Sequence, residues 1–188
     1  MELVRRTIER YVKLTDAEWA EVVPCWHTYT FAKGGRVSEA GRVERRFYIV
    51  ESGVQRLYFE HDGNDHCLGF SYDHSWSGDF DSFVSQRPGR FQVQAVTDSV
   101  LWGIERADLY RLYDRMPAME RFGRLILEEL IAGRATREVE QLALSAEERY
   151  RRLVQRSPHL LQLVAQKDIA SYLGMTPETF SRLRAKVR

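Results

Sequence analysis

The sequence lacks the marks of a secreted or membrane-inserted chain. Only two of its 188 residues are cysteines, Cys25 and Cys67, so a framework of disulfide bridges is excluded and a reducing compartment is expected. No apolar run approaches the roughly 20 residues that a membrane-spanning helix needs. The N-terminal stretch MELVRRTIERYVKL mixes charged with apolar residues and has the pattern of neither a signal peptide nor an anchor. We therefore expect a cytoplasmic protein that has no membrane partner.

The motifs of common enzyme classes are missing as well. The sequence has no glycine-rich phosphate loop followed by Lys-Ser/Thr, no nucleophile elbow and no paired cysteines of the redox type. The segment HDGNDHC gathers metal-capable residues between His61 and Cys67, but Asp62-Gly63 predicts a hairpin turn among them and no second cluster completes a site. We predict that the protein is not an enzyme and holds no metal, and the sequence names no cofactor.

What the sequence does contain is enough apolar material for a core and an uneven distribution of charge. Apolar residues make up 44% of the chain and aromatic residues 12%, which supports a folded protein. The net charge of +1 divides into +5 over residues 145–188 and −4 over residues 1–144. A phosphate backbone attracts the first part and repels the second. The ordinary alternative is a solvated helical face.

The first part of the chain has the periodicity of short β-strands. Thr15 and Glu18 form a capping box that predicts the start of a helix. From Trp26 onward apolar and polar residues alternate in short segments that glycine or acidic turns separate. These segments are WHTYTF, RVSEAG, FYIVES, VQRLYFE, HCLGFSY and FQVQAVTDSVLWGIE. Such a pattern is typical of an antiparallel roll or jelly-roll.

A long helix is expected from Met119 onward, after a short helical segment that Pro117 ends. It carries a wide apolar stripe, formed by Met119, Phe122, Ile126, Leu130, Ile131, Ala135 and Val139. Such a stripe can pack on the roll with one side and on a second copy of the chain with the other, so we expect a homodimer. The alternative is a helix packed in the core of one chain. Ser145 and Glu148 form a second capping box, which marks the start of a new domain.

Residues 166–188, QKDIASYLGMTPETFSRLRAKVR, have the pattern of a helix-turn-helix. Gly174 stands where the first helix needs a residue at positive φ. Thr176 can cap the second helix, and Pro177 suits its first position. The residues expected to face the core of this domain are Phe180, Leu183 and Val187. A helical hairpin on the surface, without DNA, is the alternative.

In their order along the chain, these parts resemble the catabolite-activator (Crp-Fnr) superfamily of bacterial transcription regulators. The segments that carry the resemblance are FYIVESGVQRLY, QAVTDSVLWGIERADL and QKDIASYLGMTPETFSRL, and it covers nearly the whole chain. It implies an α+β protein with an antiparallel, cyclic-nucleotide-binding-like β-roll over residues 1–116, a long dimer helix over 117–144, and a helix-turn-helix domain over 145–188. The implied partners are double-stranded DNA, a second copy of the chain, a small-molecule effector and RNA polymerase.

The resemblance also assigns residues to DNA. Glu178 and Arg182 stand where the family places two residues that contact base edges, whereas a third frequent contact, an arginine, falls on Pro177. We therefore expect an operator preference that differs from that of better-known members. The residues expected at the DNA interface are Lys167, Thr176, Glu178, Thr179, Ser181, Arg182 and Lys186.

The family's phosphate-binding cassette is degenerate in this sequence. Gly78 and Asp79 match its Gly-Glu pair, but the position of its phosphate-binding arginine falls on Gly89, with Arg87 and Arg90 out of register. Because side chains alternate along a strand, Arg90 would face the wrong side unless a bulge corrects it. We expect weak or no binding of cyclic AMP. The candidate ligand-binding residues are Gly78, Asp79, Phe80, Arg87 and Arg90, and the aromatic candidates for an apolar pocket are Phe70, Tyr72, Trp76, Phe80 and Phe83.

Two functions from different classes remain after this reasoning. The first is a dimeric transcription regulator that senses a small effector other than cyclic AMP. The second is a ligand-binding or scaffold module of the same fold that does not read DNA. The end of the sequence favours the second, because family members continue into a β-hairpin wing whereas this sequence stops at Arg188. An oxygen-sensing iron–sulfur cluster is not expected, since two distant cysteines cannot hold one.

Overall fold

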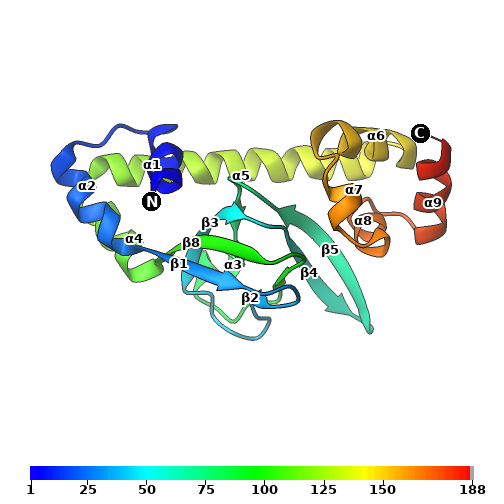
Figure 1. Cartoon of the computed structure of the whole chain (residues 1–188), viewed down its shortest axis with the longest axis horizontal. Coiled ribbons are helices and arrows are strands. Elements are labelled where there is room, and N and C mark those ends of the chain that lie inside the picture. The colour runs from blue at the N-terminus through cyan, green and yellow to red at the C-terminus, as the bar shows by residue number, and fades with distance from the viewer. Residues whose placement is uncertain (187–188) are drawn as a thin grey trace.

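One long helix, α5, organises the molecule. The structure is a computed structural model that describes residues 1–186, so Val187, expected to face the core, lies outside the described residues. Helix α5 spans Pro117–Ala143. It passes the N-terminal helices at one end, the β-strands in the middle and the C-terminal helices at the other end (Figure 1). No helix among residues 1–186 is both long and apolar enough to cross a membrane.

The strands form two antiparallel sheets, as the sequence predicts. The first has the order β1-β8-β3-β6 and the second the order β2-β7-β4-β5. Their bounds are Trp26–Phe31 for β1, Arg36–Ser38 for β2, Arg46–Ser52 for β3, Gln55–His61 for β4, Asn64–Ser71 for β5, Trp76–Ser77 for β6, Gln92–Ala95 for β7 and Ser99–Glu105 for β8. The predicted turn between β4 and β5 is present: Asp62 and Gly63 have φ values of 51° and 72°, as a two-residue hairpin turn requires.

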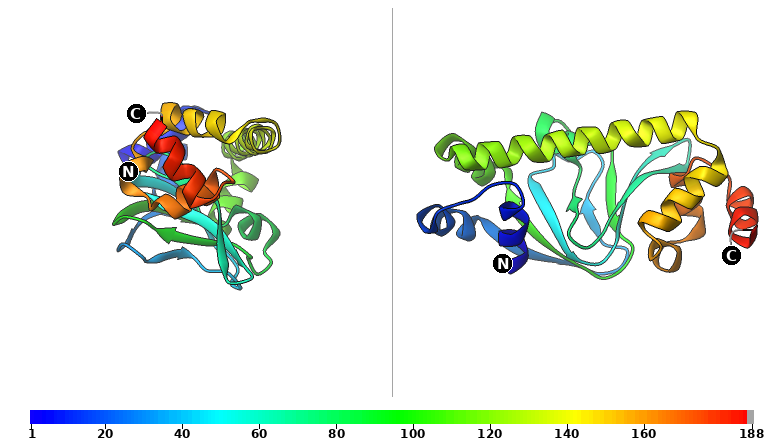
Figure 2. Two further views of the ribbon diagram at one scale, coloured as in Figure 1. Left: turned by 90° about the vertical axis from the view of Figure 1, so that its right-hand side faces the viewer. Right: turned by 90° about the horizontal axis from the view of Figure 1, so that it is seen from above.

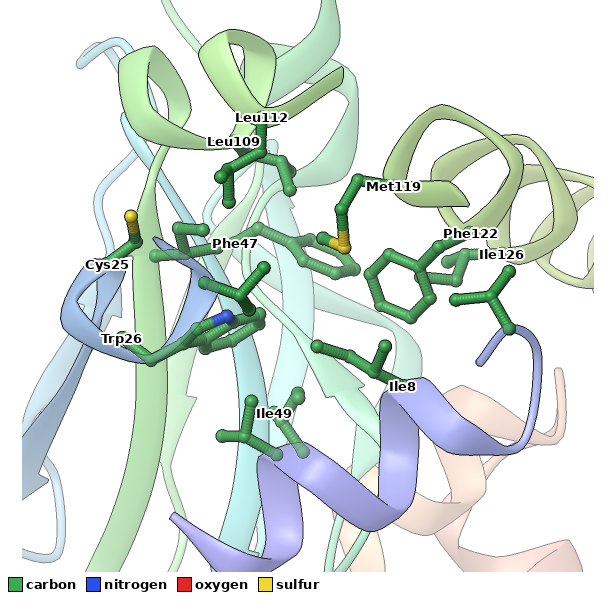
Figure 3. Close-up of a cluster of buried hydrophobic side chains, with 14 of the residues drawn as sticks. Ile8, Cys25, Trp26, Phe47, Ile49, Leu109, Leu112, Met119, Phe122 and Ile126 are labelled. Atoms are coloured by element: carbon green, nitrogen blue, oxygen red, sulfur yellow. The ribbon is translucent and has the colours of Figure 1, made fainter. Parts of the chain in front are cut away.

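The N-terminal helices join the roll and α5 in one apolar core. The N-terminal helices are α1 (Glu2–Glu9), α2 (Asp16–Val22) and the short η1 (Val23–Cys25). Helix α4 (Arg106–Arg115), which follows the last strand, joins the same core. The predicted capping box of Thr15 and Glu18 starts α2. Ile8 of α1, Phe47 of β3, Leu112 of α4 and Phe122 of α5 are among the buried members of this core (Figure 3). Each such side chain contributes on the order of 2 kcal/mol by its burial.

The C-terminal helices have a core of their own. They are α6 (Ala146–Arg156), α7 (Leu160–Leu163), α8 (Gln166–Tyr172) and α9 (Pro177–Lys186). Their buried residues include Tyr150, Ile169 and Phe180. The predicted capping box of Ser145 and Glu148 starts α6. Gly174 has φ = +64° between α8 and α9, where an added Cβ would also fall 2.6 Å from a side-chain oxygen of Gln141, so the turn specifically favours glycine.

The apolar stripe of α5 divides between two sides of the helix. Met119, Phe122 and Ile126 are buried against the rest of the chain, and Leu130 packs at the edge of the same core. On the other side Leu127, Ile131, Val139 and Leu142 are 38%, 66%, 61% and 81% exposed, and we call these four residues the outer apolar face. Seen along its axis in Figure 2, α5 lies at the margin of the molecule. The stripe is therefore only half used within one chain.

Candidate functional site

A cavity of about 180 Å³ lies between the β-roll and α5, and we call it the roll cavity. Its walls come from both sheets, from helix α3 (Phe80–Ser85) and from α5. The lining residues are Phe47, Leu57, Gly69, Phe70, Ser71, Trp76, Ser77, Gly78, Phe80, Val93, Leu130 and Arg134. Apolar and aromatic side chains dominate this set, and Arg134 is its one charged member.

The structure divides the predicted ligand-binding residues. Gly78 and Phe80 line the roll cavity, but Asp79 does not. Asp79 is buried and caps α3, because its carboxylate accepts a hydrogen bond from the Ser82 N–H at 3.2 Å. Its side chain instead borders a separate polar cavity of about 190 Å³. Burial raises the pKa of the Asp79 carboxyl.

Neither predicted arginine lines the roll cavity. The Arg90 side chain is 77% exposed and lies 3.8 Å from Asp81. Arg87 contributes its backbone carbonyl, which accepts a hydrogen bond from the Ser82 hydroxyl at 2.6 Å. Gly89, at the position of the family's arginine, lies so close to Asp79 that an added Cβ would be 2.1 Å from the Asp79 carboxylate oxygen. An arginine in this backbone position would collide with the capping aspartate.

Sequence reasoning missed the contribution of α5 to the roll cavity. Leu130 and Arg134 line it from one face of the helix, one turn apart. The four-residue spacing was a visible signal, but nothing in the sequence states which side of α5 faces the sheet. Among the aromatic candidates, Phe70, Trp76 and Phe80 do line the cavity. The others have structural positions, Phe83 in the core and Tyr72 against the C-terminal helices.

The predicted metal-capable hairpin holds no metal-binding group. Within residues 1–186 no three His, Cys, Asp or Glu side chains come together in a way that would hold a metal ion. The rings of Phe59 and His66 stack at the hairpin, 5.0 Å apart. Cys67 is buried, and desolvation raises the pKa of its thiol to about 12, so it is unreactive at neutral pH.

The polar face of α9 presents the residues predicted to contact DNA. Thr176, Glu178, Ser181, Arg182 and Lys186 are exposed, as is Lys167 on α8, whereas Thr179 is partly buried. Phe180, on the opposite face, is fully buried against Tyr150 and anchors the helix. The Thr176 hydroxyl accepts a hydrogen bond from the Thr179 N–H at 3.3 Å, as a helix cap does. The backbone N–H of Glu178 and the Thr176 hydroxyl lower the pKa of the Glu178 carboxyl.

Part of the positive charge of the C-terminal domain is already paired. Lys186 lies 2.8 Å from Glu147. Arg149 donates hydrogen bonds to backbone carbonyls of Leu144 at 2.5 Å and Leu173 at 2.7 Å, so it holds the turn of the motif in place. Arg151 and Arg152 also form ion pairs with glutamates. The net charge of +5 over residues 145–188 already subtracts Glu147, whereas Glu140 of α5 lies outside that segment, so its pairs with Arg152 and Arg156 lower the local positive charge further.

The C-terminal helices dock on the β4–β5 hairpin. The guanidinium of Arg56 lies 2.7 Å from the Asp168 carboxylate of α8, and both side chains are 12% exposed. The Ser171 hydroxyl accepts a hydrogen bond from the Cys67 N–H at 2.9 Å. The rings of Phe70 and Tyr172 lie 5.2 Å apart. Phe70 thus belongs both to this contact and to the wall of the roll cavity.

Comparison with known proteins finds the same fold in bacterial regulators. Residues 29–116 match the family model of the cyclic nucleotide-binding domain. The nitrogen fixation regulation protein FixK of Bradyrhizobium diazoefficiens is 28% identical over 169 residues, which cover 84% of this chain and 70% of that protein. The structure of FixK2 from Bradyrhizobium japonicum superposes with a TM-score of 0.72 at 18% identity, over 86% of this chain and 84% of that chain. The Thermus thermophilus catabolite activator protein gives 0.56 at 21% identity, over 93% and 84%.

Proposed function

We propose that this chain is a cytoplasmic, dimeric transcription regulator of the Crp-Fnr type that binds double-stranded DNA through α9. Its residues 29–116 match the cyclic nucleotide-binding domain of such regulators. A small effector other than cyclic AMP controls it. RNA polymerase is the further partner that this function implies. The similarity to a nitrogen fixation regulation protein supports the regulatory part of the proposal.

The observation that carries the proposal is the exposed polar face of α9. Its buried residue Phe180 fixes the helix from behind, and Glu178 and Arg182 lie one turn apart on the open side. Arginine pairs bidentately with guanine and glutamate accepts from cytosine in the major groove. Lys167 and Arg184 form no ion pair within residues 1–186, and each can meet a phosphate.

The roll supports an effector other than cyclic AMP. A cyclic phosphate needs a cation beside the short helix α3, and Gly89 and Asp79 occupy that place. Arg90, the nearest substitute in sequence, is on the surface beside Asp81. An anionic phosphate at this point would meet the capping carboxylate of Asp79 instead of a guanidinium, so we expect weak or no cyclic AMP binding.

Selection from a pool of random duplex DNA tests the proposal. We expect the wild-type protein to enrich one motif with two related half-sites, as a two-fold dimer requires. Arg182→Ala should weaken binding to the enriched site by about 1–3 kcal/mol and relax the preference at one base pair in each half-site. If no motif is enriched, the chain does not read DNA and the scaffold alternative holds.

Lys186→Ala is the matched control on the same helix. Its pair with Glu147 is exposed to solvent and therefore weak, so the ammonium is available to a phosphate. We expect this variant to weaken binding equally on all sequences and to reduce the salt slope by about one unit. Equal losses on every sequence for Arg182→Ala as well would mean that α9 meets only the backbone.

A further inference from the structure

We infer that the roll cavity binds a small organic monocarboxylate with an apolar body, and that Arg134 of α5 holds its carboxylate. This inference rests on the proposed function, because it names the chemical class of the effector. The site is built from the cavity walls, the charge at its edge and the link from its wall to the C-terminal helices.

The walls of the roll cavity favour a compact apolar ligand. The volume of about 180 Å³ is below the 300–1,000 Å³ typical of pockets for drug-sized molecules. Aromatic side chains of Phe47, Phe70, Trp76 and Phe80 line it, and none of its lining residues is acidic. A cationic ligand would therefore find no counter-charge. A cyclic nucleotide would leave its ribose hydroxyl and the polar edges of its base unpaired against apolar walls.

Arg134 supplies the one charge. Its side chain is exposed and forms no hydrogen bond or ion pair with the part of the chain that the structure describes. The next arginine on the helix differs, because Arg137 donates to the Tyr172 carbonyl at 2.6 Å and lies 3.7 Å from the centre of that ring. A guanidinium matches a carboxylate with two parallel hydrogen bonds. An arginine without a protein partner at the edge of an apolar cavity is suited to an anion with an apolar body.

The cavity wall is connected to the DNA-binding part of the chain. Phe70 lines the cavity and contacts Tyr172 of α8, and Arg137 holds the same tyrosine from α5. A ligand that orders Phe70 therefore acts on one support of α8, and a ligand held by Arg134 lies one turn of α5 away from the other support, Arg137. This arrangement gives an effector in the cavity a physical route to the position of α9.

Calorimetry on the full-length, DNA-free protein tests the inference. The probes are benzoate and octanoate, with benzyl alcohol and octanol as uncharged molecules of matched apolar shape. We expect at least one carboxylate to bind. Its alcohol should bind at least roughly tenfold more weakly, because the charge-assisted hydrogen bonds are lost. If neither carboxylate gives binding heat at millimolar concentration, the inference is wrong.

Three variants locate the site. Arg134→Gln should weaken the carboxylate roughly tenfold or more and leave the alcohol unchanged, whereas Arg124→Gln, an exposed arginine paired with Glu128 on the same helix, should change neither. Gly69 pairs with Leu57 across the sheet, so both face the cavity, and an added Cβ there meets nothing within 4 Å. Gly69→Leu should therefore fill the cavity and abolish binding by both probes.

The outcomes separate this inference from the proposed function. Unchanged carboxylate binding in Arg134→Gln, or an equal loss of carboxylate and alcohol, overturns the role of Arg134. Carboxylate binding that survives Gly69→Leu, in a variant whose circular dichroism and melting temperature match the wild type, places the ligand elsewhere. A protein that selects a DNA motif and binds no carboxylate is still a regulator, and one that binds carboxylate without selecting DNA is the ligand-binding module.

Discussion

Asp79 shows how one residue can satisfy a family pattern and yet have a different role. It follows Gly78, as the acidic residue of a ligand cassette does, but its carboxylate caps α3 and its second oxygen has no partner among the described residues. Three further carboxyl groups bear on its charge. Asp81 raises the pKa of Asp79, Asp79 raises that of Glu44, and Glu39 borders the same polar cavity. The aspartate therefore serves the fold at an electrostatic cost.

Asp79→Asn should stabilise the protein, and the gain should depend on pH. The folded-state pKa of Asp79 lies above its unfolded value of about 3.9, so ionisation costs stability as the pH rises through that window. Asparagine keeps the cap without the charge. In denaturant unfolding from pH 3.5 upward, the variant's advantage in unfolding free energy should therefore grow with pH and then level off. An advantage that is the same at every pH would mean that the charge is not the cause.

At the scale of single residues, the sequence predicted the features that depend only on residues close together in the chain. The capping boxes at Thr15 and Ser145, the Asp62-Gly63 turn and the glycine at 174 depend on local backbone geometry, and all are present. The roll cavity is different, because its lining residues come from elements that are distant in sequence. The sequence was enough to show that Arg87 and Arg90 are out of register with the family's arginine. It could not show that the Asp79 carboxylate lies too close to Gly89 for any side chain at that position.

Helix α5 is the element whose two sides have different partners. Its inner side belongs to the core around Phe122, and its outer apolar face is exposed in one chain. The sequence predicted the stripe but not its division, because the rotation of the helix on the roll decides which residues face inward. From the apolar pattern alone, Ile126 is as good a candidate for the dimer interface as Ile131, but in the structure Ile126 is 2% exposed. A charge at Ile126 would therefore test the core of one chain and not the dimer.

Ile131→Glu should dissociate the homodimer without unfolding the chain. The side chain is 66% exposed, so a charge there leaves the core of one chain intact but disrupts an apolar seam between two copies. The exposed residue Thr136 lies about 140° further round the helix than Ile131, so Thr136→Glu is the matched control. Sedimentation should find a dimer for the wild type and the control and a monomer for Ile131→Glu. A wild-type monomer at micromolar concentration, or a dimer that survives the charge, would exclude this seam.

At the scale of the whole molecule, the position of the C-terminal helices depends on a few polar contacts with the roll. Arg56 is central among them, because its guanidinium also donates a hydrogen bond to the Gln94 side-chain oxygen, forms an ion pair with Asp65 and lies 4.0 Å from the centre of the Tyr58 ring. The sequence pattern predicted that Lys167, the neighbour of Asp168, contacts DNA. It gave no sign that Asp168 faces the hairpin. A contact between residues 112 positions apart depends on the packing of two complete domains. Local pattern cannot predict it.

Removing both members of the pair should cost less than the sum of the losses from removing each alone. Arg56→Leu leaves the carboxylate of Asp168, 9% exposed, without its counter-charge, which costs about 3–5 kcal/mol when a buried pair is broken. In the double variant with Asp168→Leu the loss should fall short of the sum of the single losses by about 0.5–3 kcal/mol. Arg151→Leu, which breaks an exposed pair with Glu147, should cost much less than Arg56→Leu because solvent screens that pair.

Denaturant unfolding gives the coupling energy of that cycle, and hydrogen exchange at α8 shows where it acts. We expect Arg56→Leu to raise exchange at the Cys67 amide, because the hydrogen bond that it donates to the Ser171 hydroxyl of α8 depends on the same docking, and at the amides of α8 itself. Exchange in the core around Phe122 should stay unchanged, since that core does not include α8. Additive losses together with unchanged exchange at α8 would mean that Arg56 and Asp168 do not hold the domains together. A coupled result would show that this ion pair holds the C-terminal helices on the roll.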